Sequence, residues 1–284
     1  MTTSEEIKLP ERGPICIPSE NVYDSSSLSD FMRCPFYYYN RYELKRFPSY
    51  GLGVELEFGS AIHEALAHWL THDHDIDGAV KIFLSYPGIL SIEDGKRNPE
   101  QGEALLRQYH TRWGGDTMLE ILKDDVGDLF IERPFILPIG GYSEAFFAGR
   151  IDAGVRMGNE IYALDHKTTS GKHFLLPNLR PYLQFDGYSY AMREEFGSCA
   201  GLIVDFLELG KAKYDFGRVP TPRSEWELEQ FPVQFLNLVA HIQLCRASEQ
   251  WPKYTTHCYE YFRRCPYENL CMHNTDMGLV VQES

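Results

Sequence analysis

Residues 149–167 read GRIDAGVRMGNEIYALDHK, and this stretch decides the fold prediction because it spans two strand-like runs and their turn. The runs cover 145–155 and 160–167, on either side of a Met-Gly-Asn turn. Asp152 and Asp165 each interrupt an otherwise apolar strand. On adjacent strands of a hairpin, the two carboxylates can point to the same place at one end of the sheet.

The chemistry of these acidic residues suggests a metal site. Two carboxylates that lie close repel each other unless a cation sits between them, and a hard divalent cation with oxygen ligands does this well. Lys167 leaves the strand on the same face as Asp165. An ammonium beside a metal-bound water can stabilise charge on a phosphate or orient the nucleophile. The alternative is a surface hairpin with alternating charges.

The segments around the hairpin indicate an α/β fold. Residues 130–137 form a third strand-like run, so the three strands make a β-meander. A helix is expected from Pro181 to Glu195, followed by a near-continuous apolar strand at 202–207. The predicted core is therefore helix, three-stranded meander, helix and strand.

Helices are predicted on both sides of this core. The upstream ones run from about Ser27 to Tyr42, from about Phe58, and over 99–123. Downstream, the capping box at 224–227 opens a helix that reaches about Arg246.

A single domain with an extended lead-in is the predicted organisation. The lead-in covers 1–24 and the domain 25–284. The domain has three parts, namely N-terminal helices (25–125), a catalytic core (126–210) and a C-terminal helix with a cysteine cluster (211–284).

Composition excludes several classes of protein. With 284 residues, 43% of them hydrophobic and 24% charged, the chain is neither disordered nor collagen-like. It has no apolar run of about 20 residues and no signal-peptide pattern, which predicts an intracellular, cytoplasmic protein without a membrane partner. The net charge of 27 − 41 = −14 disfavours a tight, sequence-reading DNA binder. It is compatible with a nuclease, since carboxylates hold the metal.

Four motifs together resemble the PD-(D/E)XK (restriction-endonuclease-like) superfamily, and more narrowly its RecB and Cas4-like exonuclease branch. Asp152 with Asp165-His166-Lys167 resembles the nuclease core, and FGSAIHE at 58–64 resembles the upstream helix motif with a metal-ligating histidine. QFDGY at 184–188 resembles the Gln-x-x-x-Tyr motif, and the serines before Cys34-Pro35 resemble the opening helix. The motifs span residues 27–271 in the family's order.

The resemblance implies a role for each matching residue. His63, Asp152 and Asp165 would bind Mg²⁺ or Mn²⁺, with the His166 carbonyl as a further ligand. Lys167 would be the catalytic lysine, and Gln184 and Tyr188 would steady the DNA backbone or the active site. Alternatively, His63 and Tyr188 are core residues. Glu132 offers another carboxylate, which we leave outside the predicted metal-binding set.

Four of the seven cysteines suggest a second metal centre. Cys258, Cys265 and Cys271 lie within 14 residues, and Cys34 precedes them by more than 220. Four thiolates suit tetrahedral Zn²⁺ or an iron–sulfur cluster. Cas4-like and AddB-like nucleases have a similar layout, which implies a [4Fe-4S] cluster here. Their triplet usually begins Cys-x-x-Cys, whereas six residues separate Cys258 from Cys265, so zinc stays open. The remaining cysteines read as structural.

The expected function is a metal-dependent DNA nuclease, by resemblance an exonuclease on single strands or DNA ends. A bacterial or phage setting in recombination, repair or CRISPR adaptation would supply a protein partner. Two alternatives remain. One is a catalytically silent DNA-binding or assembly subunit of such a complex, and the other is a metal-stapled interaction protein.

Overall fold

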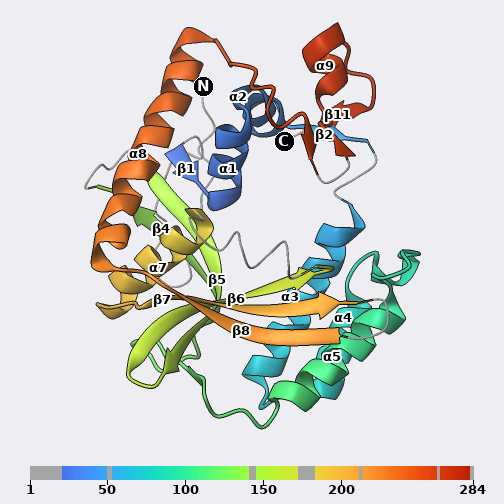
Figure 1. Ribbon diagram of the computed structural model, residues 1–284, viewed down its shortest axis with the longest axis vertical. Coiled ribbons are helices and arrows are strands. Elements are labelled where there is room, and N and C mark those ends of the chain that lie inside the picture. The colour runs from blue at the N-terminus through green and yellow to red at the C-terminus, as the bar shows by residue number, and fades with distance from the viewer. Residues whose placement is uncertain are drawn as a thin grey trace. The chain divides into compact units, whose positions relative to one another are not determined.

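The computed structural model describes residues 21–49, 53–140, 145–171, 183–210, 214–260 and 263–281 (Figure 1). The chain divides into two compact units. The terminal unit combines Met1–Leu52, Ile136–Gly149 and Glu229–Ser284, and the core unit combines Gly53–Phe135 and Arg150–Leu228. Each unit is therefore assembled from segments that are far apart in the sequence.

A mixed sheet forms the centre of the core unit, which confirms the predicted α/β class. Its strands follow the order β5 (Phe146–Met157), β6 (Glu160–Thr169), β7 (Gly201–Leu209) and β8 (Tyr214–Pro222). β5 and β6 are antiparallel, β6 and β7 are parallel, and β7 and β8 are antiparallel. The short β3 (Glu120–Ile121) and β4 (Ile131–Pro138) also pair with β5, whose first four residues belong to the terminal unit.

The predicted strands are present within a few residues of their expected bounds, and one strand was not predicted. β7 is buried along nearly its whole length, as expected for an apolar strand inside a sheet. β8 was missed because Gly217, Pro220 and Pro222 argue against a strand. It is the last strand in the order, and an edge position tolerates prolines that cannot donate to the ladder.

Three helices cover one face of this sheet. α3 (Val54–Thr71), α4 (Ile76–Ser85) and α5 (Pro99–Trp113) lie together in Figure 1 and share an apolar core with Leu207 and Leu209 of β7. α4 was not predicted, and the short 3-10 helix η3 (Ile89–Ser91) follows it. α5 ends at Trp113, ten residues before the predicted end, at the pair Gly114-Gly115.

The crossover helix between the parallel strands is α7 (Leu183–Phe196). It lies against β6 and β7, through side chains such as Gln184 and Phe185 that contact Lys167. The expected start of this helix at Pro181 lies outside the described residues.

In the terminal unit, the predicted opening helix is broken into pieces. α1 (Ser25–Arg33) is followed by α2 (Pro35–Tyr38) and a π-helical turn, η2 (Tyr39–Glu43). The break falls at Cys34, which is extended (φ −167°), because a residue before proline is pushed out of the helical region. Asp24 caps α1, and its carboxylate accepts the Ser27 N–H at 2.6 Å.

Short strands join distant segments of the terminal unit. β1 (Val22–Tyr23) pairs with the start of β5, and β2 (Arg46–Pro48) pairs with β11 (Leu279–Val281). β9 (Tyr259–Glu260) and β10 (Arg263–Arg264) form a small hairpin before α9 (Glu268–His273). These pairings place segments from both ends of the chain in one compact unit.

The long helix α8 (Glu225–Ser248) begins with the predicted capping box. The Glu227 carboxylate accepts the Ser224 N–H at 2.8 Å, and the Glu227 N–H donates to Ser224 Oγ at 3.3 Å. The unit boundary falls within the first turn of this helix. None of the described helices has the length and apolar composition needed to cross a membrane.

Candidate metal centre and catalytic lysine

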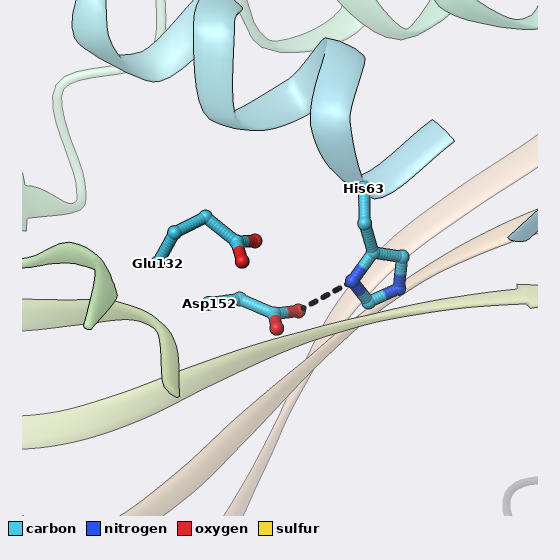
Figure 2. Close-up of side chains that lie close together, drawn as sticks. All are labelled: His63, Glu132 and Asp152. Carbon is cyan, nitrogen blue, oxygen red and sulfur yellow. Dashed lines mark ion pairs between the residues drawn. The ribbon is translucent and has the colours of Figure 1, made fainter. Parts of the chain in front are cut away.

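Three side chains from separate elements converge in the core unit. Figure 2 shows His63 on α3 facing the carboxylates of Glu132 and Asp152. One potential ligand atom from each residue lies within 4.8 Å of those of the other two. His63 Nδ1 is 3.2 Å from Asp152 Oδ2. Within the described part of the chain, this is the one such group of three.

Local structure explains why these side chains meet. In α3, the flanking residues Phe58, Ala61 and Ile62 are fully buried, which fixes the face on which His63 leaves the helix. Asp152 is 8% exposed, between the buried Ile151 and Ala153 of β5.

Glu132 follows the first residue of β4 and has a φ of +47°. Non-glycine residues rarely adopt this left-handed conformation, and such strain often marks functional positions. Sequence reasoning left Glu132 out because nothing local distinguishes it from an ordinary strand glutamate. The FIERPF context gave no signal for a positive φ.

A second cluster surrounds the predicted catalytic lysine. Lys167 Nζ lies 2.9 Å from Asp165 Oδ2, and it donates to Asp165 Oδ1 at 3.0 Å and to Gln184 Oε1 at 3.3 Å. Gln184 Nε2 in turn donates to Asp165 Oδ1 at 3.1 Å. Asp165 is 1% exposed, so Lys167 and Gln184 act on a buried carboxylate.

Asp165 lies next to, but outside, the group formed by His63, Glu132 and Asp152. The β5–β6 register ends at Ala153 opposite Leu164, one residue short of Asp152 and Asp165. The charge of Asp152 raises the pKa of Asp165, and the convergence of both carboxylates on one metal stays a prediction. The structure also brings Glu132 to His63 and Asp152.

Tyr188 lies one turn after Gln184 on α7 and is 7% exposed. Its hydroxyl bonds to the Gln184 side chain, and its ring meets Phe135 edge-on at a centroid distance of 5.8 Å. Tyr188 therefore holds the Gln184 side chain through its hydroxyl, and most of its own side chain is buried.

His166 contacts Asp152 through backbone and side chain. Its N–H donates to Asp152 Oδ2 at 2.7 Å, and its Nδ1 is 3.3 Å from the same oxygen. Its carbonyl, the predicted metal ligand, stays a prediction.

The electrostatics of the cluster favour a bound cation. Burial and the charge of Asp152 raise the pKa of Asp165, although Lys167 opposes them. Burial and the same charge raise the pKa of Glu132. Burial alone would raise the pKa of Asp152, but the side chains of His63 and His166 hold it below its usual range. Three carboxylates thus compete for compensating positive charge in one small region.

The donor set fits a hard divalent cation. Octahedral Mg²⁺ holds its ligands at about 2.1 Å, which puts ligand atoms about 3.0 to 4.2 Å apart. The atoms of His63, Glu132 and Asp152 lie within 4.8 Å of one another, close to that range. Two carboxylates suit Mg²⁺ and Mn²⁺, and an imidazole is tolerated by Mn²⁺.

In the terminal unit, the four predicted cysteine ligands line one cavity of about 60 Å³. Cys34 lies between α1 and α2, Cys258 and Cys265 flank the β9–β10 hairpin, and Cys271 lies in α9. The Cys265 N–H donates to the Cys258 carbonyl at 2.9 Å. The hairpin thus explains the unusual gap of six residues, because its two ends meet.

The other cysteines stand apart from this cavity. Cys199 and Cys245 are buried, in agreement with a structural role, and Cys16 lies outside the described residues.

Comparison with known proteins identifies the class. The family model "PD-(D/E)XK nuclease superfamily" matches residues 25–272, and the chain therefore belongs to this superfamily. Among solved structures, it is similar to a "Putative exonuclease" from Eubacterium rectale. The TM-score is 0.53 at 14% identity, over 93% of this chain and 91% of that chain. This likeness shows the fold alone.

A second solved structure, of SSO0001, has a TM-score of 0.36 at 12% identity, over 90% of this chain and 88% of that one, and we draw nothing from it. No curated protein matches the chain.

Proposed function

We propose that this member of the nuclease superfamily is a metal-dependent deoxyribonuclease of the RecB and Cas4-like branch, acting as an exonuclease on single strands or DNA ends. The observation that carries the proposal is the meeting of His63, Glu132 and Asp152 beside the Asp165–Lys167 pair. A silent scaffold has no chemical need to keep a buried carboxylate paired with a lysine at this point.

Each residue has a role in the proposed mechanism. His63, Glu132 and Asp152 would hold Mg²⁺ or Mn²⁺, with Asp165 and the His166 carbonyl as further oxygen donors. The cation, when bound, polarises the phosphate and lowers the pKa of a coordinated water. Lys167, 27% exposed at its side chain, can reach a phosphate oxygen or orient the nucleophile from its Asp165 contact. Gln184, supported by Tyr188, holds the ammonium at Nζ in place.

We propose a [4Fe-4S] cluster at Cys34, Cys258, Cys265 and Cys271. Tetrahedral Zn²⁺ with Zn–S bonds of about 2.3 Å requires sulfur atoms about 3.8 Å apart. No three of these four described sulfur atoms meet within 4.8 Å, although all four line one cavity. Four cysteine thiolates are the ligand set of a [4Fe-4S] cluster, and the layout of these cysteines resembles that of the Cas4-like and AddB-like nucleases. Absorbance near 400 nm in anaerobically prepared protein would support the cluster. A colourless protein that contains one zinc ion per chain would contradict the cluster and favour a zinc site.

The catalytic proposal is tested with end-labelled single- and double-stranded DNA and Mn²⁺ or Mg²⁺. We expect Lys167→Ala to lower the cleavage rate by about 10²-fold or more, a typical loss for a catalytic group that acts on charge in the transition state. Lys81→Ala, on the exposed side of α4, is the matched control and should cleave like wild type.

The outcomes separate the candidate functions. Metal-dependent cleavage that disappears in Lys167→Ala supports the proposal, and the ladder of products gives the polarity. A folded wild-type protein that cleaves neither substrate with either metal favours the silent DNA-binding subunit. Cleavage that survives in folded Lys167→Ala contradicts the assignment of the lysine.

A further inference from the structure

His166 stands between Asp165 and Lys167 on β6, but its side chain serves the other face of the sheet. Side chains alternate along a strand, so the neighbours that contact Gln184 leave on the α7 face. The His166 ring lies on the face of α5, where its centroid is 6.4 Å from that of Tyr109, and the residue is 2% exposed. Its ring therefore leaves the sheet on the face opposite to the Lys167 side chain, although the two residues are adjacent in sequence.

Two donors of His166 converge on one oxygen of Asp152. The last residues paired between β5 and β6 at this end are Ala153 and Leu164. Two residues further along β6, the backbone N–H of His166 donates to Asp152 Oδ2 at 2.7 Å. His166 Nδ1 lies 3.3 Å from the same oxygen. Because an ionised carboxylate only accepts, the ring nitrogen that faces it is the one that carries the proton.

The other ring nitrogen of His166 has no such contact. Nε2 is buried and has no hydrogen-bond partner among the residues that the structure describes. An imidazole buried in a protein usually satisfies both nitrogens. The contact with Asp152 is therefore the one hydrogen-bonding contact that the ring nitrogens make with the described residues.

A row of polar residues on neighbouring strands fixes the side chains that surround the His166 ring. His166 pairs in register with Asp205 of β7, which pairs with Arg218 of β8, so all three side chains leave the sheet on one face. Asp205 Oδ2 accepts the Tyr109 hydroxyl at 2.7 Å and Arg218 Nε at 2.9 Å. These bonds fix Tyr109, against which the His166 ring packs.

We propose that His166 is a positioning residue whose Nδ1–H fixes the Asp152 carboxylate for metal binding. The metal part rests on the proposed function, whereas the contact with Asp152 does not. Residues that orient a ligand in this way typically change metal affinity about 10- to 100-fold when they are removed.

The test compares two substitutions that differ only in the donor. In His166→Asn, the side-chain amide can offer an N–H near the place of Nδ1, whereas His166→Leu fills the space without a donor. We expect His166→Leu to weaken Mn²⁺ binding in calorimetry by about tenfold or more. His166→Asn should stay within about threefold of wild type, which a purely packing role would not produce.

His110→Leu is the matched control. His110 accepts the Trp69 Nε1–H at 3.0 Å in the same unit, so its loss removes a hydrogen-bonded ring that does not contact Asp152. Its Mn²⁺ affinity should equal that of wild type. Urea unfolding of all three variants shows which of them fold.

A second readout needs no metal and no variant of His166. In ¹⁵N spectra of the metal-free protein, we expect the His166 ring to be the tautomer with its proton on Nδ1. Asp152→Ala should remove the preference for this tautomer. Wild type that binds no Mn²⁺ but keeps this signature contradicts the proposed nuclease and supports the contact.

Three results overturn the proposal. These are His166→Leu with wild-type Mn²⁺ affinity, folded His166→Asn as weak as His166→Leu, and a wild-type ring protonated at Nε2 instead of Nδ1. If neither variant folds, the tautomer in wild type decides.

Discussion

Glu132 combines a left-handed backbone with a half-buried carboxylate beside two other proposed metal ligands, His63 and Asp152. Strain of this kind costs about 1 to 3 kcal/mol and persists where the surroundings determine it. Burial and the charge of Asp152 disfavour the charge of Glu132, and Arg150, whose Nε lies 2.9 Å from Glu132 Oε2, offsets them only in part. A bound cation would stabilise this carboxylate further, in line with the proposed role of Glu132 as a metal ligand.

We therefore expect Glu132→Gln to weaken Mn²⁺ binding by about tenfold or more, which is about 1.4 kcal/mol. The amide keeps the size of the side chain and removes its charge, so calorimetry reads the loss of one charged ligand. Glu120→Gln, on exposed β3, is the control and should bind as wild type does. If Glu132→Gln and wild type bind Mn²⁺ with equal affinity, the Glu132 carboxylate is not a metal ligand.

His63 predicts a pH dependence of stability in EDTA. Burial alone lowers the pKa of His63, but the charge of Asp152 outweighs it and raises the pKa above the ordinary value. The folded state therefore holds the proton more tightly than the unfolded state, whose pKa is about 6.5. The stabilisation is complete below that pH and is lost as pH rises through the folded pKa.

Urea unfolding at about pH 6 and about pH 8 measures this effect. Wild type should lose more stability over that interval than His63→Gln, which cannot titrate. The same slope in both proteins would mean that the charge of Asp152 does not raise the pKa of His63.

At the scale of elements, α8 shows how a local signal fixes a boundary. The Ser224–Glu227 capping box satisfies backbone donors at the first turn of a 24-residue helix. Because these donors have no partner within the helix, the cap is worth more than an average surface contact.

Ser224→Ala should lower the free energy of unfolding by about 1 kcal/mol, the usual cost of losing an N-cap. Ser248→Ala, at the other end of the helix, removes a hydroxyl bonded to the Leu244 carbonyl and should cost much less. Chemical denaturation of both variants checks the difference, and equal losses would argue against the cap.

The β9–β10 hairpin is the element that reconciles the cysteine spacing with a shared centre. A gap of six residues is too long for two ligands on one helical turn, but a hairpin returns the chain to its starting point. Burial raises the pKa of Cys265 to about 11, so its thiol is protonated in the cofactor-free protein. Binding of a cluster or of zinc would release this proton.

At the scale of the whole molecule, the cysteine cavity links segments from opposite ends of the chain. A cofactor held by Cys34 and by the 258–271 segment would close a loop of more than 200 residues. Closing a long loop stabilises the folded state through the entropy of the unfolded chain.

Removing this cofactor with a chelator should therefore increase hydrogen exchange in both segments together, near Cys34 and over 258–271. Exchange in β6 and β7, which are buried in the core unit, should stay slow. Hydrogen-exchange mass spectrometry measures both, and Cys34→Ser should reproduce the chelated pattern. Loosening of one segment alone would show that the two do not share a ligand.

The sequence by itself determined the meander, the strand β7, the capping box and the placement of Asp152, Asp165 and Lys167 on strands of the meander. These features depend on alternation, turns and caps, which act between residues close in the chain. The four cysteines could be grouped because three of them lie at short spacing near the end of the sequence, which is unusual for structural thiols.

Only the tertiary structure decided which distant residues meet. It brought Glu132 to His63 and Asp152 and turned the His166 ring toward Asp152. It also revealed the edge strand β8 and the short helix α4, which their own sequences do not predict without the surrounding structure. The physical reason is that packing and sheet register fix these contacts, and neither is encoded in any short stretch of residues.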